Sequence, residues 1–302
     1  MTILNGRISL KSSQYPKLLR EVFNPPKELF FRGNFDLINK ACISIVGTRK
    51  STDYGKFAVK TILDDLSGFD ICTVSGLALG IDTYVHEISL ENDIPTIAVL
   101  GSGLNNIYPP ENIKLAEKIA EKGLLLSEFE EDIEPKNFHF PMRNRIISGL
   151  SCATIVVEAR EKSGALITAK LALDQGREIF VVPGDIDRET SRGTIRLLQS
   201  CAAYPILSGH DVIDVLRKQS LFKGSVNEEG RKKINKMPEI NLFKLDKDEE
   251  KVLDVLSKNK SKIFEDIQIA LGMDVSELMA ILSILEIKGY IEIKDNKYRR
   301  LL

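Results

Sequence analysis

Ala41-Cys-Ile-Ser-Ile-Val-Gly47-Thr-Arg49 is the first of five short apolar runs that stop at a glycine, or at a small polar residue beside an acid or a base. The other four are Ile71-Cys-Thr-Val-Ser75-Gly76, Thr96-Ile-Ala-Val-Leu-Gly101-Ser-Gly103, Ala153-Thr-Ile-Val-Val-Glu158 and Ile179-Phe-Val-Val-Pro-Gly184-Asp185. All five are rich in Val and Ile without polar alternation, which is typical of strands buried on both faces. Because helical patterns separate the runs, we expect an α/β fold with a parallel sheet and helices on both faces.

The ends of these runs are the places where such a sheet would hold a ligand. Ligands of open α/β sheets bind beyond the carboxyl ends of the strands. Glycines at those ends let backbone N–H groups approach an anion closely. The sequence therefore predicts a phosphate-binding edge.

Composition limits the kinds of partner. The 302 residues suffice for one large domain and a small one. The formal net charge of −1 gives no general attraction to nucleic acid, so such binding would need local clusters of Arg and Lys. The four cysteines and three histidines lack metal-ligand spacing, so we expect reduced thiols and no metal site. Without an apolar segment long enough for a signal peptide or a membrane span, we expect a cytoplasmic protein.

The chain divides by pattern into four parts. Residues 1–35 are expected to form an N-terminal arm, 36–218 the α/β region, and 219–243 a solvated linker. In 244–302, three helical patterns precede a hairpin, which suggests a winged helix-turn-helix. The expected helices cover 53–67, 80–91, 111–122, 143–150, 164–175, 192–200, 210–217, 247–258, 262–271 and 275–288.

The turn after the first run offers phosphate ligands. Gly47 permits close backbone approach, the Thr48 hydroxyl can donate a hydrogen bond, and the Arg49 guanidinium can hold two oxygens at once. The alternative is an ordinary strand-to-helix turn with a surface arginine.

The second turn begins at Ser75 and Gly76 and leads into a helical pattern, but its glycine spacing differs from that of a dinucleotide fingerprint. Asp82 and His86 share one helix face there. They could form an acid–base pair, although a structural contact on the helix is the more usual role of such a pair.

The third turn, Gly101-Ser102-Gly103, again permits close backbone approach. It leads to Tyr108, whose ring could stack on a base or simply pack under the loop.

Phe138-His-Phe-Pro-Met-Arg143-Asn144-Arg145 is the stretch most suggestive of nucleic acid. Guanidiniums bind phosphates, while amides and aromatic rings meet bases. Alternatively, either arginine could be buried and paired with Glu128 or Glu158. Farther along, Ser163 and Gly164 open a helix whose amino terminus could hold an anion, with Thr168 and Lys170 in its following turns.

These blocks, in this order, resemble the DNA-processing protein family called DprA or Smf. The resemblance covers residues 15 to about 217. It is carried by Val46-Gly-Thr-Arg49, Val74-Ser-Gly-Leu-Ala78, Gly101-Ser-Gly103 with Tyr108-Pro109, Phe140-Pro-Met-Arg-Asn-Arg-Ile146, Val157-Glu-Ala159, Ser163-Gly-Ala-Leu-Ile-Thr168 and Val182-Pro-Gly184.

The resemblance implies an extended Rossmann-like fold that binds single-stranded DNA as a homodimer, without a catalytic reaction and without a cofactor. It also implies a role in natural transformation or recombination, in which the RecA recombinase is loaded onto incoming strands. The implied DNA pocket uses Arg49, Arg143, Arg145 and Lys170 beside the glycine-rich turns. The chain departs from the family pattern at Ile195, where an amide is usual, and at Cys201.

Two other functions compete with this hypothesis. Enzymes that look related cleave nucleoside monophosphates at the glycosidic bond. Such a phosphoribohydrolase would use the same phosphate-binding site together with a carboxylate such as that of Glu158. Their Pro-Gly-Gly-x-Gly-Thr block is absent, because Val182-Pro-Gly184-Asp185 diverges from it. A transcription regulator acting through 244–302 is disfavoured because the expected recognition helix, 275–288, carries Glu277 and Glu286 and few base-reading side chains.

Overall fold

The computed structural model describes residues 3–219, 221, 245–256, 261–294 and 297–301. The chain divides into two units, Met1–Lys236 and Met237–Leu302. The predicted linker 219–243 lies outside the described residues except at positions 219 and 221.

A nine-stranded sheet organises the larger unit, in the order β1-β2-β6-β5-β4-β3-β7-β8-β9. The five predicted strands are all present and parallel: β3 (Ala41–Val46), β4 (Ile71–Ser75), β5 (Thr96–Val99), β7 (Ala153–Val156) and β8 (Glu178–Val181). Two further parallel strands were not predicted, β6 (Leu124–Ser127) and β9 (Tyr204–Pro205). β9 has only two residues, and neither strand carries the Val- and Ile-rich run that marks the others.

The N-terminal segment continues this sheet, which corrects the expectation of a separate arm. The strands β1 (Asn5–Ser9) and β2 (Glu28–Gly33) pair antiparallel, and β2 pairs antiparallel with β6. The sheet is therefore mixed at one edge. The short elements α1 (Lys17–Arg20) and η1 (Phe35–Asn39) flank β2, and the Tyr15 hydroxyl donates to the Pro26 carbonyl.

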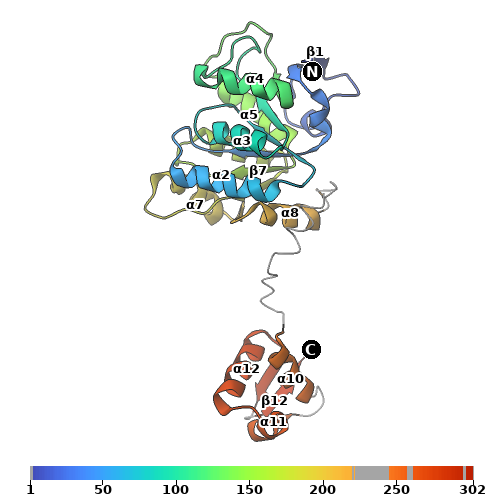
Figure 1. Cartoon of the computed structure of the whole chain (residues 1–302), viewed down its shortest axis with the longest axis vertical. Coiled ribbons are helices and arrows are strands. Elements are labelled where there is room, and N and C mark those ends of the chain that lie inside the picture. Colours follow the sequence, from blue (N-terminus) through green and yellow to red (C-terminus); the bar gives the residue numbers. More distant parts are fainter. Residues whose placement is uncertain (1–2, 220, 222–244, 257–260, 295–296, 302) are drawn as a thin grey trace. The chain divides into compact units, whose positions relative to one another are not determined.

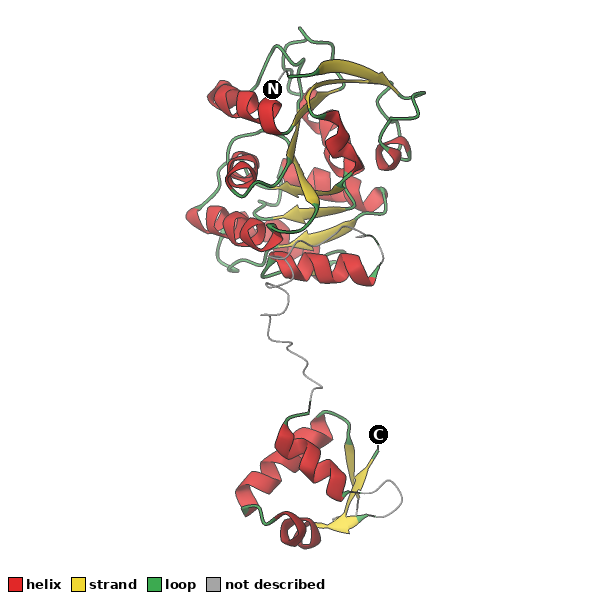
Figure 2. Ribbon diagram, turned by 45° about the vertical axis from the view of Figure 1, so that its right-hand side comes forward, coloured by secondary structure: helices red, strands yellow, loops and turns green. Residues whose placement is uncertain are grey.

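Helices cover both faces of the sheet, as predicted (Figure 1 and Figure 2). One face packs against α2 (Asp53–Leu66), α3 (Ile81–Glu91), α4 (Ile113–Lys122) and α8 (Gly209–Lys218). The other packs against α1, α5 (His139–Leu150) and α6 (Gly164–Asp174), with α7 (Arg192–Gln199) beside them. Short 3-10 turns, η2 (Pro110–Asn112) and η3 (Glu189–Ser191), precede α4 and α7.

The strand β3 shows why apolar and polar residues do not alternate in the runs that predicted the strands. Its Cys42 and Val46 are buried in the core on the α5 and α6 face, whereas Ile43 and Ile45 are buried in the core on the α2 and α3 face. Because both faces are covered, every position along the strand favours an apolar side chain.

The described residues of the smaller unit form three helices and a three-stranded antiparallel sheet. Its elements are α10 (Lys247–Val255), β10 (Lys262–Ile263), α11 (Phe264–Leu271), α12 (Val275–Ile287), β11 (Ile291–Lys294) and β12 (Lys297–Arg300), with the strands in the order β10-β12-β11. Asp246 and Glu249 form a capping box at the start of α10. The predicted hairpin is present, its turn at 295–296 lying outside the described residues. The assignment of this unit as a winged helix stays a prediction.

Across the described ranges, no individual helix combines the length and the apolar composition needed to cross a membrane. Taken together, α11 and α12 meet that test on length and composition alone, with a bend of 114° between them.

Candidate anion-binding site

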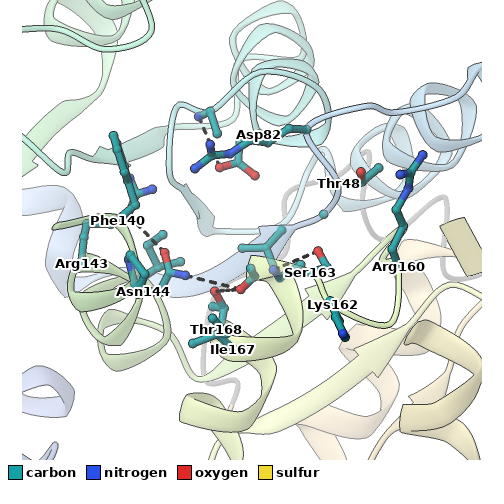
Figure 3. Close-up of a pocket in the computed structure, with 18 of the residues that line it drawn as sticks. Thr48, Asp82, Phe140, Arg143, Asn144, Arg160, Lys162, Ser163, Ile167 and Thr168 are labelled. Carbon is teal, nitrogen blue, oxygen red and sulfur yellow. Dashed lines mark hydrogen bonds between the residues drawn. The ribbon is translucent and has the colours of Figure 1, made fainter. Parts of the chain in front are cut away.

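The strand order places a crevice between β3 and β7. From β3 the chain proceeds through β4, β5 and β6 on one side, and β7 begins the other side of the sheet. Ligands of open α/β sheets bind at this reversal, beyond the carboxyl ends of the strands. A pocket of about 340 Å³ lies there, where the turns after β3 and β7 meet the start of α5 (Figure 3).

Eight of the fifteen predicted site residues line this pocket, which we call the anion pocket. They are Gly47, Thr48, Arg49, Arg143, Asn144, Ser163, Gly164 and Thr168. Gly76 lines a smaller adjoining hollow. The other six, which line neither space, are Ser75, Gly101, Ser102, Gly103, Arg145 and Lys170.

The turn after β3 is fixed by its neighbours. The Thr48 N–H donates to the Glu158 carbonyl, and the Thr48 carbonyl accepts from the Ile81 N–H. A side chain at Gly47 would place its Cβ 2.5 Å from Ile81, so only glycine allows this close packing against α3. The result is an exposed Arg49 whose guanidinium carbon lies 5.4 Å from the centre of the Phe140 ring.

The amino terminus of α6 forms the opposite wall. The Ser163 hydroxyl caps the helix by accepting from the Ala165 N–H. The Gly164 carbonyl accepts from the Asn144 amide at 3.4 Å and from the Thr168 hydroxyl at 3.3 Å, which ties α5 to α6. The partial positive charge of the helix end therefore faces the pocket.

The charge of the pocket favours anions. Among the described residues, four cationic side chains and a single carboxylate line it: Arg49, Arg143, Arg160, Lys162 and Asp82. Figure 3 shows Phe140, Arg143 and Asn144 on one side and Arg160 and Lys162 on the other, with Ser163 and Thr168 between them. Sequence reasoning did not select Phe140, Arg160 or Lys162 as site residues. Phe140 opens one of the blocks that carried the resemblance, whereas Arg160 and Lys162 lie between the blocks Val157–Ala159 and Ser163–Thr168.

Arg143 lies at the base of the pocket, and hydrogen bonds hold its side chain in place. Its side chain is buried, and its Nη1 donates to the carbonyls of Gly76 and Val99, at the ends of β4 and β5. Burial lowers the pKa of Arg143 to about 10, against the attraction of Asp82. The Asp82 carboxylate accepts from the N–H groups of Gly76 and Ala78, while burial raises its pKa. Arg143 therefore organises the pocket floor and adds positive charge from beneath.

Arg145 has a structural position, which corrects its predicted role in the DNA pocket. Its guanidinium makes a two-pronged ion pair with Glu128, with N–O distances of 3.0 and 2.6 Å, and each side chain is only 12% exposed. This is the alternative pairing that the sequence had left open. Lys170 is exposed on α6 but lies outside the anion pocket, so it does not converge with Arg49.

The remaining predicted residues shape the strand ends. The Ser75 hydroxyl donates to the Ile45 carbonyl, and the Ser102 hydroxyl donates to the Asn106 carbonyl. A Cβ at Gly101 would lie 2.7 Å from the Phe140 ring, and one at Gly76 would lie 2.6 Å from the Arg143 guanidinium. A Cβ at Gly103 would meet the backbone of 130–131. Gly76 and Gly101 thus allow close packing against Arg143 and Phe140, which line the pocket, whereas Gly103 allows close packing against a neighbouring loop.

Asp82 and His86, the possible acid–base pair on α3, each form hydrogen bonds with a different partner. His86 is fully buried and shares a hydrogen bond with Thr96 through Nδ1 at 2.8 Å, whereas Asp82 binds the backbone of the β4–α3 turn. Burial lowers the pKa of His86 to about 3, so its imidazole is neutral at physiological pH. These contacts favour the structural interpretation of both residues.

Fold and site together define an α/β protein that presents a cationic pocket, with an aromatic ring at its margin, at the reversal point of its sheet. Residues 7–217 match the family described as DNA recombination-mediator protein A, and the chain belongs to this family of DNA-processing proteins. The similarity predicted from the sequence blocks is thereby confirmed.

Individual relatives agree with the family assignment. The DNA processing protein DprA of Bacillus subtilis is 44% identical over 215 residues, covering 71% of this chain and 72% of that protein. The X-ray structure of DprA from Streptococcus pneumoniae has a TM-score of 0.68 at 40% identity, covering 70% of this chain and 74% of the other. The structure of DNA processing protein A from Helicobacter pylori, which describes its mode of single-stranded DNA binding, has a TM-score of 0.64 at 34% identity. The match covers 70% of this chain and 96% of that chain.

Proposed function

We propose that this chain binds single-stranded DNA in the anion pocket and delivers it to the RecA recombinase during recombination and natural transformation. The proposal includes a homodimer located in the cytoplasm and no catalytic reaction. It is supported by family membership and by the single-stranded DNA binding of the Helicobacter pylori relative.

The observation that carries the proposal is the arrangement of cations around one end of the sheet. Arg49, Arg160 and Lys162 are exposed around a pocket that also contains a helix amino terminus. Phosphates are held by such groups, and bases stack on rings such as that of Phe140. The combination suits a chain of nucleotides better than an isolated phosphate. Binding is expected to be salt-dependent and tolerant of sequence.

The position of Glu158 favours binding over nucleotide cleavage. This side chain is 2% exposed and accepts three hydrogen bonds, from the N–H and hydroxyl of Thr52 and from the hydroxyl of Thr190. It also lies outside the anion pocket. A carboxylate engaged in this way is poorly placed to act on a substrate there. Incubation with nucleoside monophosphates, followed by a search for free base, tests the competing enzymatic hypothesis.

The test of the DNA pocket removes two exposed cations from opposite walls. We expect Arg49→Ala with Lys162→Ala to weaken binding of an oligothymidylate at least tenfold, because each charged contact contributes about 1.5–3 kcal/mol. Each lost phosphate contact should also reduce the slope of log affinity against log salt by about 0.7. Fluorescence anisotropy at several salt concentrations measures both effects.

The matched control is Arg7→Ala, an exposed arginine on β1 that does not line the anion pocket. Its affinity should stay within about twofold of the wild type. Arg143 is left unchanged because its burial would confuse a binding defect with a folding defect. Equal affinity of the double variant and the wild type would refute the assignment of the pocket. Adding purified RecA to the protein–DNA complex and timing filament formation tests the delivery step separately.

A further inference from the structure

A second, smaller hollow adjoins the anion pocket. It has a volume of about 50 Å³ and is bordered by Leu79, Tyr108 and Pro109. Arg49, Phe140 and Arg143 line both spaces, so the two adjoin each other. Anything held by the cations of the anion pocket therefore has this hollow immediately beside it.

Aromatic and aliphatic surfaces dominate the hollow. Tyr108 is 44% exposed, and the centre of its ring lies 5.5 Å from that of Phe140, with 42° between the ring planes. Leu79 is 41% exposed on the facing turn. Phe140 in turn has the Arg49 guanidinium over its ring. Tyr108, Phe140 and Arg49 thus form a continuous series of flat groups beside the phosphate-binding cations.

The loop that carries Tyr108 is held on both sides of the ring. Before it, the Ser102 hydroxyl donates to the Asn106 carbonyl at 2.6 Å, and the Asn106 amide donates to the Asp132 carbonyl. After it, the Asn112 amide donates to the Leu77 carbonyl at 2.9 Å. Because the loop is already ordered, a ligand that meets the ring there loses little binding free energy to ordering.

We propose that Tyr108 is a base-stacking residue, which receives the nucleobase next to a phosphate bound in the anion pocket. The proposal rests on the proposed function and adds the part of the nucleotide that this margin contacts. A flat, uncharged heterocycle joined to a phosphate matches an aromatic hollow joined to a cationic pocket. Stacking is open to every base because each has a π-face, so the contact adds affinity without sequence preference.

Replacing Tyr108 by a fluorescent side chain tests directly whether a base contacts this position. The chain contains no tryptophan, so Tyr108→Trp provides a single indole whose emission can be followed selectively. We expect oligothymidylate to quench this emission. An abasic deoxyribose-phosphate strand of the same length, which offers phosphates without bases, should bind with little quenching, and inorganic phosphate should cause none. Quenching of equal size by the abasic strand would overturn the proposal.

Two further substitutions test the contribution to affinity. Tyr108→Ala should weaken oligothymidylate binding about 5- to 100-fold, the range that corresponds to stacking of one base. Tyr108→Phe should bind like the wild type, because the ring and not the hydroxyl makes the contact. Neither change should alter the salt slope or the affinity for the abasic strand, since no cation is removed. Thermal unfolding by circular dichroism checks that each variant is folded.

The possible failures can be told apart. If Tyr108→Ala retains full affinity for oligothymidylate, or loses affinity equally for the abasic strand, Tyr108 does not stack on a base. If the wild type binds neither strand at any salt concentration, the proposed function itself fails. A loss of affinity in both the phenylalanine and the alanine variants would assign the effect to the hydroxyl and refute stacking.

Discussion

The ion pair between Arg145 and Glu128 provides the most direct test of the distinction between structural and binding arginines. Arg145→Ala would leave the Glu128 carboxylate without its partner in a site where each side chain is 12% exposed. Removing one partner of a buried pair costs about 3–5 kcal/mol, and the partial access of water here lowers the expected loss to about 3 kcal/mol. The same substitution should leave affinity for single-stranded DNA within about twofold of the wild type.

Urea unfolding of the whole chain, followed by far-ultraviolet circular dichroism, measures the loss of stability. Residue 145 belongs to the larger unit, so unfolding of the unit Met237–Leu302 should be the same in the variant and the wild type and serves as an internal control. DNA affinity is measured by anisotropy at a temperature where the variant is fully folded. The double variant Glu128→Gln with Arg145→Met removes both charges and should recover part of the stability, because no carboxylate is left unpaired.

The opposite pattern would refute the reasoning. If Arg145→Ala cost less than about 1 kcal/mol of stability, the ion pair would not hold α5 in the way that the contacts indicate. If it also reduced DNA affinity more than tenfold, Arg145 would belong to the binding surface, as the sequence had suggested.

Two other predictions follow from packing and titration. Gly101→Ala should push the Phe140 ring from its place, because the new Cβ would lie 2.7 Å from that ring, and should weaken oligothymidylate binding several-fold in the anisotropy assay; unchanged affinity would contradict this. Because burial lowers the pKa of His86 from 6.5 to about 3, the unfolded chain takes up its proton first as the pH falls. The free energy of unfolding should therefore decrease between about pH 6.5 and pH 3, by about 1.4 kcal/mol for each unit of pKa difference. His86→Gln should flatten this dependence in urea titrations, and an equally steep variant would show that another group is responsible.

The sequence predicted the parallel strands and the anion edge because both depend on local patterns. Runs of Val and Ile identified β3, β4, β5, β7 and β8, and the glycines marked the strand ends. The strand β1 was not predicted, because an antiparallel strand at the edge of a sheet has one face partly exposed and a weak hydrophobic pattern. The segment of β2 was expected to be extended, but its membership of the sheet was not predicted. The place of β2 in the sheet depends on its pairing with β6, and that of β1 on its pairing with β2, and no local sequence pattern indicates either pairing.

The arginines show a second limit of sequence reasoning. Arg49, Arg143 and Arg145 look alike in a motif, yet they are exposed, buried under the pocket and ion-paired, respectively. What separates them is contact with residues far along the chain, such as Val99 and Glu128. The same reasoning undervalued Arg160 and Lys162, whose loop reaches the pocket only because β7 lies beside β3.

The adjacency of β3 and β7 has a consequence for the synthesis of the protein. The hydrogen bond from the Thr48 N–H to the Glu158 carbonyl joins residues that are 110 positions apart in the sequence. The wall at Ser163 and Gly164 is synthesised later still. A nascent chain that ends after α5 therefore contains only part of the pocket lining and lacks the wall formed by Arg160, Lys162, Ser163 and Gly164. If the proposed DNA binding is correct, the chain becomes able to bind DNA only after translation has passed the start of α6.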